Sequence, residues 1–390
     1  MVTSALLRVA FFGTPDFAVP TLGALIESRH DVVALVSQPD RPKGRGHKLQ
    51  PTPTKQVALD AGIPVLQPAR IRDEAFLAAF RDLRVDLGVV AAYGKILPDA
   101  LLAIPPMGMI NVHASLLPAY RGAAPVHRAV IDGLAETGVT IMRVVRELDA
   151  GPMLARVTRP IADDETSVDV ERGLAELGAR LLVDVIERLA AGTAKEEPQD
   201  DSAATYAPKI TREESPIDWT RSAASIHNQV RGLNPWPRAS TSLDGARLIV
   251  IRTIPEEVHL SAGTEVPASQ SADSGSRLQT PGSGASLTHH YPAADKARSP
   301  ESGAWRPDPS TAKPESQIRQ ITGDPADVEP ELQFRRILPG TVIDATGDAI
   351  RVATGDGVLL ILALQPEGKR VMTAREFLAG RPIAAGTRLS

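Results

Sequence analysis

The sequence contains no cysteine and few aromatic residues. Among its 390 residues there is no Cys, and Phe, Trp and Tyr together make up 4%. The absence of Cys excludes a disulfide scaffold, a zinc or iron–sulfur site with Cys ligands, and a Cys nucleophile. It is also typical of proteins from reducing compartments, and we expect a cytoplasmic protein.

Long hydrophobic runs and a strong net charge are missing as well. The longest apolar run, 358–364, is far shorter than the roughly 18 residues that span a membrane. The formal net charge is −4, and this value gives no indication of nucleic-acid binding. We therefore expect a soluble protein without a membrane partner, in which only local charge could attract a nucleic acid.

Glycine-rich nucleotide motifs are absent too. The first apolar run, 8–13, ends at Gly13 and continues as Thr-Pro-Asp-Phe. A dinucleotide site would need the pattern G-x-G-x-x-G here, but only one of its glycines is present. No P-loop pattern occurs anywhere in the chain. The sequence therefore predicts neither a dinucleotide cofactor nor P-loop chemistry.

The first half of the chain alternates short apolar runs with helical patterns. This alternation predicts a Rossmann-like parallel sheet with helices on both faces. A long amphipathic helix over 166–191, which begins with a capping box of Thr166 and Asp169, closes the region. We place the first domain at 1–191, with its main apolar runs at 8–13, 32–37, 86–93, 108–115 and 138–145.

The second half has the pattern of a small β-domain. A polar segment at 192–208 carries a charge run, and we interpret it as a linker. The domain at 209–390 contains one predicted helix and then several short strands with tight turns, which is typical of a small barrel or sandwich. Its predicted strands lie at 246–254, 340–346, 349–354 and 358–365.

An unusual composition interrupts this second domain. Residues 255–330 hold 10 Pro, 11 Ser and 6 Gly, but only 8 Leu, Ile, Val or Phe. Such a segment cannot bury enough apolar surface to offset the entropy lost on ordering. Strand patterns resume on both sides, so we expect a disordered insertion at 255–332.

Asn111 and His113 form the strongest local signal for chemistry. They lie two residues apart in a predicted strand, so both side chains project from the same face. They are near the carboxyl end of the strand, where open α/β sheets bind ligands. His can relay a proton near neutral pH, and the Asn amide can donate a hydrogen bond to a developing oxyanion. A purely structural role for either residue remains the alternative.

Asp149 follows the next apolar run. If the two runs are neighbours in the sheet, we expect their ends to be adjacent, so that Asp149 could orient His113 or take part in proton transfer. A turn carboxylate before Gly-Pro is the alternative interpretation. Together, Asn, His and Asp favour acyl or formyl transfer without a covalent enzyme intermediate, since no metal-ligand set or activated Ser or Cys competes with them.

A basic loop lies between 38 and 55. Five cations oppose a single carboxylate, Asp40, and four prolines stiffen the segment. Both an ordinary solvated loop and an arm for a phosphate backbone fit this composition. The cations are Arg41, Lys43, Arg45, Lys48 and Lys55.

Taken together, these motifs resemble the methionyl-tRNA formyltransferase family. The resemblance covers nearly the whole chain apart from the insertion. In the first half it rests on FFGTPDF (11–17), QPDRPKGRG (38–46), AYGKILP (92–98), NVHASLLPAYRGAAPV (111–126) and LDAGPML (148–154). In the second half it rests on LNPWP (233–237) and LQPEGK (364–369), which are similar to the tRNA-binding domain of this family.

The resemblance implies an enzyme that transfers the formyl group of 10-formyltetrahydrofolate to the α-amino group of methionyl-tRNA, producing the initiator formylmethionyl-tRNA. It implies Asn111, His113 and Asp149 as the catalytic set, an OB-like second domain that holds tRNA, no metal, and a monomer. It implies folate contacts by Tyr93, Gly94, Ile96, Ser115, Leu116, Leu117 and Pro118. For tRNA it implies Arg41, Lys43, Arg45 and Lys48, with Arg45 at the tip of the basic loop.

Two other functions share parts of this pattern. A formyltetrahydrofolate hydrolase, or a formyltransferase for a small amine, would have the same catalytic set without the tRNA domain. A non-catalytic RNA-binding protein built on a dead enzyme is the alternative from another class, and the intact Asn111, His113 and Asp149 argue against it.

Overall fold

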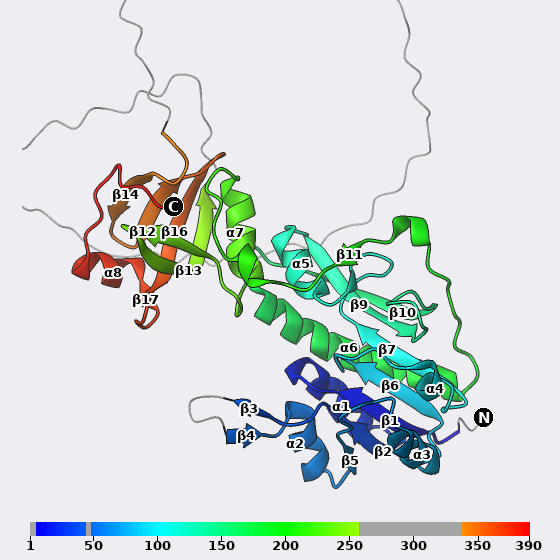
Figure 1. The fold of residues 1–390 in the computed structure, drawn as a ribbon. Coiled ribbons are helices and arrows are strands. Elements are labelled where there is room, and N and C mark those ends of the chain that lie inside the picture. The colour runs from blue at the N-terminus through cyan, green and yellow to red at the C-terminus, as the bar shows by residue number, and fades with distance from the viewer. Residues whose placement is uncertain (1–4, 44–47, 257–336) are drawn as a thin grey trace, which may run out of the picture. The chain divides into compact units, whose positions relative to one another are not determined.

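The structure is a computed structural model that describes residues 5–43, 48–256 and 337–390, without the side chains of Lys43 and Lys48. Two sheets with their helices form the described part of the chain (Figure 1). The predicted insertion at 255–332 lies outside the described residues, except that Pro255 and Glu256 belong to a strand. In the described residues, no helix has both the length and the apolar character to cross a membrane.

A seven-stranded sheet forms the first domain, in the order β10-β9-β7-β6-β1-β2-β5. Its strands are β1 (Arg8–Gly13), β2 (Asp31–Val36), β5 (Val65–Leu66), β6 (Leu87–Ala91), β7 (Met109–His113), β9 (Glu136–Arg143) and β10 (Met153–Pro160). The five strands from β5 to β7 are parallel, as predicted. β9 and β10 are antiparallel additions at one edge, so the sheet is mixed and not purely parallel.

Helices cover both faces of this sheet, which explains why its central strands β1, β2 and β6 are largely apolar. One core contains side chains of α1 (Val19–Glu27), α2 (Pro53–Asp60), α5 (Pro125–Ile131) and α6 (Ser167–Ala190). The core on the other face contains side chains of α3 (Glu74–Asp82) and α4 (Asp99–Leu102). The predicted capping box is present, because Thr166 and Asp169 bond reciprocally at the start of α6.

Shorter elements complete the first domain. The basic loop forms a hairpin of β3 (Arg41–Lys43) and β4 (Lys48–Gln50), which projects beside α2 in Figure 1. A 3-10 helix, η1 (Asp16–Ala18), follows β1. β8 (Arg121–Gly122) pairs in parallel with β11 (Tyr206–Ala207), which comes from the segment predicted to be a linker. That segment also contains η2 (Asp201–Ala203), and η3 (Arg212–Glu214) follows it.

An antiparallel six-stranded sheet forms the second domain, consistent with the predicted OB-like fold. The strand order is β12-β13-β16-β15-β14, with β17 paired to β16. Ile226 of α7 and Phe377 of α8 pack into its core. Its elements are α7 (Ala223–Gly232), β12 (Ser240–Leu243), β13 (Ala246–Glu256), β14 (Val342–Thr346), β15 (Ala349–Ala353), β16 (Val358–Pro366), β17 (Met372–Thr373) and α8 (Ala374–Gly380).

Candidate active site

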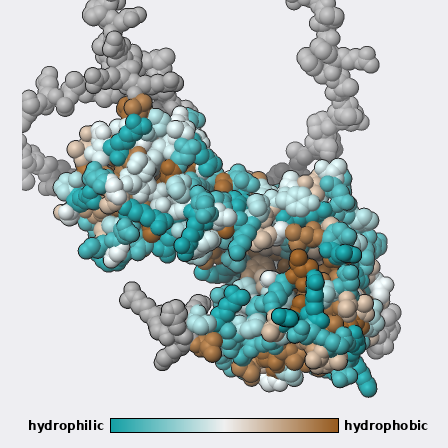
Figure 2. Space-filling model, in the orientation of Figure 1, coloured by the Kyte–Doolittle hydropathy of each residue, from teal (hydrophilic) through white to brown (hydrophobic). Residues whose placement is uncertain are grey.

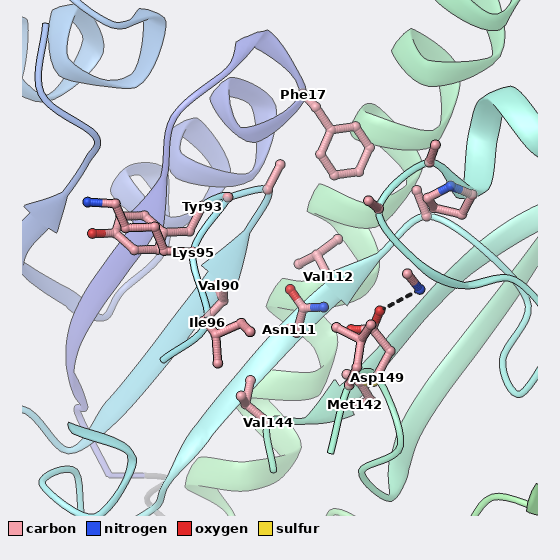
Figure 3. A pocket seen from close by; sticks show the side chains of 18 of the residues that line it. Phe17, Val90, Tyr93, Lys95, Ile96, Asn111, Val112, Met142, Val144 and Asp149 are labelled. Carbon is pink, nitrogen blue, oxygen red and sulfur yellow. Dashed lines mark hydrogen bonds between the residues drawn. The ribbon is translucent and has the colours of Figure 1, made fainter. Parts of the chain in front are cut away.

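A cavity of about 670 Å³ opens beside the carboxyl ends of β6 and β7. Its walls are mostly apolar and come from the loop after β6, the loop before α5, and the loop between β9 and β10 (Figure 3). In Figure 2, hydrophobic residues gather on the face formed by this sheet and its loops. An apolar hollow with a few polar groups is the usual form of a small-molecule site.

Asn111 lines this cavity from the middle of β7. Its amide nitrogen points toward Asp149 in Figure 3. No hydrogen bond links the Asn111 side chain to another described residue, whereas its backbone is fixed in the sheet opposite Val90 and Met142. A rigid backbone with an unengaged amide is well suited to bind a substrate oxygen.

His113 lies at the end of the same strand and is only 5% exposed. Its Nε2 lies 3.0 Å from the carbonyl oxygen of Tyr120. Because a carbonyl only accepts hydrogen bonds, Nε2 carries a proton and donates it, which leaves Nδ1 free to take up a second proton. Nδ1 lies 3.7 Å from Oδ2 of Asp149, close enough for a charge interaction once the ring is protonated.

Asp149 is adjacent to His113, but for a different reason from the one predicted. β9 is antiparallel to β7, with His113 opposite Thr140, so the end of β9 lies beside the start of β7. The loop from Arg143 to β10 then brings Asp149 back to His113. Its Oδ2 accepts a hydrogen bond of 2.8 Å from the backbone N–H of Gly122, drawn as the dashed line in Figure 3.

Three non-glycine residues around the site have left-handed backbone conformations. They are Ala92 at φ 48°, Tyr120 at φ 60° and Asp149 at φ 50°. Each such residue costs about 1–3 kcal/mol unless its surroundings hold it in place, and residues of this kind cluster at functional sites. Tyr120 and Asp149 are the residues whose backbone or side chain contacts His113.

The predicted folate-binding residues separate into two groups. Tyr93, Gly94 and Ile96 line the cavity. Ser115, Leu116, Leu117 and Pro118 are not among its lining residues, so their contact with folate stays a prediction. Local hydrogen bonds hold this segment in place. The Ser115 hydroxyl donates to the Ala119 carbonyl at 2.7 Å, and the Leu117 N–H donates to Thr140 Oγ1 at 3.1 Å.

The residues that line the cavity differ in how much of each is exposed to solvent. Tyr93 is 2% exposed and its ring packs edge-on against Phe12, so its side chain belongs to the core, where burial raises the pKa of the phenol to about 12. Ile96 is 75% exposed and Leu148 58% exposed, on two different loops of the cavity wall. Exposed apolar side chains at a cavity are available to a flat, apolar ligand.

Sequence reasoning missed several residues of the site. Glu171 of α6 lines the cavity, and burial raises the pKa of its carboxyl. Gln199, in the segment predicted to be a linker, donates from Nε2 to the carbonyl oxygens of Asp149 and Gly151, both at 2.8 Å. The polar composition that predicted a linker gave no signal of these contacts, because a free linker and a bonded segment have the same composition.

Only part of the basic hairpin belongs to the described residues. Arg41 is exposed, while Arg45 and the side chains of Lys43 and Lys48 lie outside the described residues. The one carboxylate of the loop, Asp40, is engaged by Lys55 Nζ at 2.6 Å and by the Gln67 amide at 2.7 Å, and these hydrogen bonds lower its pKa. The partners of Asp40 therefore lie outside β3 and β4.

Across the described ranges, no group of three or more His, Asp and Glu side chains is arranged to hold a metal ion.

Comparisons with known proteins were made for the whole chain. Residues 7–186 match the family described as formyl transferase, and residues 209–290 and 311–382 match the formyl transferase C-terminal domain. The methionyl-tRNA formyltransferase of Pelobacter propionicus is 42% identical over 98% of this chain and 95% of its own length. The chain belongs to the methionyl-tRNA formyltransferase family. A second member, from Heliobacterium modesticaldum, is 40% identical over 98% of this chain and 99% of its own length.

Solved structures agree with the fold of this family. HypX from Aquifex aeolicus, crystallised with tetrahydrofolic acid, aligns with a TM-score of 0.54 at 15% identity. The match covers 96% of this chain and 47% of HypX. At this identity the likeness supports the fold only.

Proposed function

We propose that Asn111, His113 and Asp149 carry out the reaction of this family in the chain. The enzyme formylates methionyl-tRNA with a formyltetrahydrofolate, which makes the formylmethionyl-tRNA used in translation initiation. The observation that supports the roles is that the Asn111 amide lines the cavity while the His113 ring lies 3.7 Å from Asp149 beside it. The donor is taken to be the 10-formyl isomer, and the reaction to occur in the cytoplasm.

The chemistry begins at the amine. A free α-amine has a pKa of about 7.7–8.0, so part of it is an uncharged nucleophile at neutral pH. Its attack on the formyl carbon forms a C–N bond and a tetrahedral oxyanion. In our proposal the Asn111 amide donates to this oxyanion and protonated His113 stabilises its charge. Asp149 holds His113 and accepts the amine proton through water. The bond between the formyl carbon and folate N10 then breaks, N10 takes up a proton, and tetrahydrofolate is released.

The folate is placed along the apolar part of the cavity. Ile96 and Leu148 supply the exposed apolar surface, and the backbone around Gly94 supplies polar groups close to it. Ring systems are bound in this way in many pockets, with apolar walls for area and a few polar groups for orientation. In our proposal the formyl group then lies near Asn111.

The tRNA is assigned to the basic hairpin and the second domain. Arg41, Lys43, Arg45 and Lys48 lie in or between β3 and β4 and would contact phosphates of the acceptor stem. The second domain matches the family's C-terminal model, and relatives named for methionyl-tRNA cover it. A hydrolase or a small-amine formyltransferase would not need this domain. We take the enzyme to be a monomer, as the family resemblance implies.

The test is transfer of a labelled formyl group from 10-formyltetrahydrofolate to methionyl-tRNA. We expect product with methionyl-tRNA, and none with free methionine or with folate alone. The variant His113→Ala should lose about 10²–10³ in turnover, because the oxyanion loses one stabilising group. Circular dichroism verifies that the variant is folded. A folded His113→Ala enzyme with normal turnover would contradict the proposed role, and release of formate without transfer would favour a hydrolase.

A further inference from the structure

Three consecutive residues, Tyr120, Arg121 and Gly122, connect His113 to Asp149. The Tyr120 carbonyl accepts the hydrogen bond from His113 Nε2 at 3.0 Å. Two residues later, the Gly122 N–H donates to Asp149 Oδ2 at 2.8 Å. The separation between the imidazole and the carboxylate is therefore fixed by one short piece of backbone.

Arg121, the residue between them, binds Gln199, which in turn binds the backbone of Asp149. Arg121 has a buried guanidinium, 5% exposed, which donates from Nε and Nη2 to Oε1 of Gln199 at 3.1 and 2.8 Å. The Gln199 amide nitrogen uses its two protons on the carbonyls of Asp149 and Gly151. Gln199 thus makes four hydrogen bonds, and its side chain can take only one orientation.

The segment 199–207 also holds this tripeptide in place. The Tyr120 and Arg121 N–H groups donate to the hydroxyl and carbonyl oxygens of Thr205, both at 2.9 Å. Gly122 has φ 121°, and a Cβ there would lie 2.9 Å from the carbonyl oxygen of Ala207, so only glycine allows this approach. The segment lies between the two family matches, which end at 186 and begin again at 209.

We propose that the segment 199–207 is part of the active site, in which Gln199 and Arg121 act as positioning residues that hold Asp149 at its working distance from His113. This inference rests on the roles proposed above for His113 and Asp149. Its physical basis is that Asp149 has a left-handed backbone, at φ 50°, which an aspartate keeps only when its neighbours hold it. Without the two bonds from Gln199, the loop relaxes and the carboxylate moves away from His113.

The test compares two nearby substitutions, one inside the segment and one just before it. Gln199→Leu removes all four hydrogen bonds of the amide at similar size. Glu197→Gln is the matched control, since the Glu197 side chain is 65% exposed and, among the described residues, pairs with Arg156 alone, at 3.4 Å, while its backbone bonds to Met153 stay in place. For each variant, kcat and the KM of both substrates are measured, together with the ¹⁵N resonance of His113 Nδ1.

We expect Gln199→Leu to lower kcat about 10–100-fold, as is typical when a supporting group is lost, with KM changed less than twofold. The His113 Nδ1 resonance should shift, because the neighbouring carboxylate has moved. Glu197→Gln should behave as the unmodified enzyme. A purely structural role would lower the unfolding midpoint and leave both kcat of the folded enzyme and the resonance unchanged, and this result would overturn the inference.

Two further variants keep the test decisive. If Gln199→Leu does not fold, Gln199→Glu keeps the acceptor for Arg121 but cannot donate to the two carbonyls at neutral pH, and the same loss of kcat is expected. Asp149→Asn separates this inference from the proposed function. If Asp149→Asn is inactive while both Gln199 variants have full kcat, the positioning role is wrong and the catalytic assignment stands. If Asp149→Asn is also fully active, the assignment of Asp149 itself fails.

Discussion

Polar side chains beside β7 and polar side chains on the surface of the second domain are held in opposite ways. Around β7, polar groups are buried and bonded to backbone atoms: His113 to the Tyr120 carbonyl, Asp149 to the Gly122 N–H, and Gln199 to two carbonyls. A backbone atom in a packed domain cannot move independently, so a side chain bonded to it has a defined position.

On the six-stranded sheet, side chains pair with each other in solvent. The ion pairs Arg375–Asp348, Arg381–Asp244 and Arg370–Glu376 join side chains that are each more than 40% exposed. Such pairs form and break easily and are screened by salt. The site beside β7 therefore has the fixed geometry that formyl transfer requires, whereas the surface ion pairs of the second domain can rearrange, which fits our proposal that this domain contacts tRNA.

Salt should therefore affect tRNA binding far more than it affects the chemical step. If about four phosphates are contacted, the binding constant should fall by roughly 10²-fold between 50 and 200 mM salt, because bound counterions are released on association. Arg41→Ala should weaken binding at each salt concentration and reduce the slope by about one. Filter binding measures both quantities, and single-turnover rates at saturating tRNA provide the comparison for chemistry.

Binding that does not depend on salt would refute the assignment of the basic hairpin. A chemical rate that falls as steeply as binding would refute the contrast between the two regions.

The sequence predicted the strand that contains Asn111 and His113, but it did not predict how this strand and β9 are arranged relative to each other. The run 108–115 is apolar except where Asn111 and His113 alternate on one face, so both the strand and its two polar residues could be recognised. The direction of β9 could not, because an apolar run has the same pattern whether it pairs in parallel or antiparallel. Asp149 is adjacent to His113 because of a loop path, which periodicity does not describe.

The segment 192–208 shows a second limit of sequence patterns. It is polar, and polarity predicted a linker. In the structure, Gln199 of this segment makes four hydrogen bonds, two of them to backbone carbonyls of the loop that contains Asp149. Composition reports whether a segment can form an apolar core, but it does not report whether its polar groups have partners elsewhere.

Packing under β7 offers a test of how rigid the first region is. A Cβ at Gly178 of α6 would lie 2.8 Å from Val112 Cγ1 and 3.3 Å from Val139, whereas a Cβ at Gly173 would meet only the end of the flexible Arg159 side chain. Gly178→Ala should therefore destabilise the enzyme by about 1–3 kcal/mol through overpacking. Urea unfolding measures the effect.

Gly173→Ala on the same helix is the control. There the better helix propensity of alanine, worth about 0.5–1 kcal/mol, is offset by the shift of the Arg159 guanidinium, which is paired with Glu165, so we expect little net change in stability. Because Val112 separates Asn111 from His113, Gly178→Ala should also lower kcat, and Gly173→Ala should not. Equal stability changes in the two variants would show that the packing under β7 yields more readily than the distances indicate.

The smallest effect is expected on the six-stranded sheet. Arg375 donates to both carboxylate oxygens of Asp348, at 2.6 and 2.8 Å, and these bonds lower the pKa of that carboxyl. A carboxyl whose pKa is lowered in the folded protein stabilises the fold at pH values above its ordinary pKa of 3.8, and this contribution is lost as the pH falls below that value.

The side chains of Arg375 and Asp348 are both about 70% exposed, however, so solvent and salt screen the pair. Arg375→Met should therefore leave the thermal unfolding midpoint unchanged at pH 7 and 150 mM salt. A drop as large as that of Gly178→Ala would mean that the second region, too, depends on fixed polar geometry.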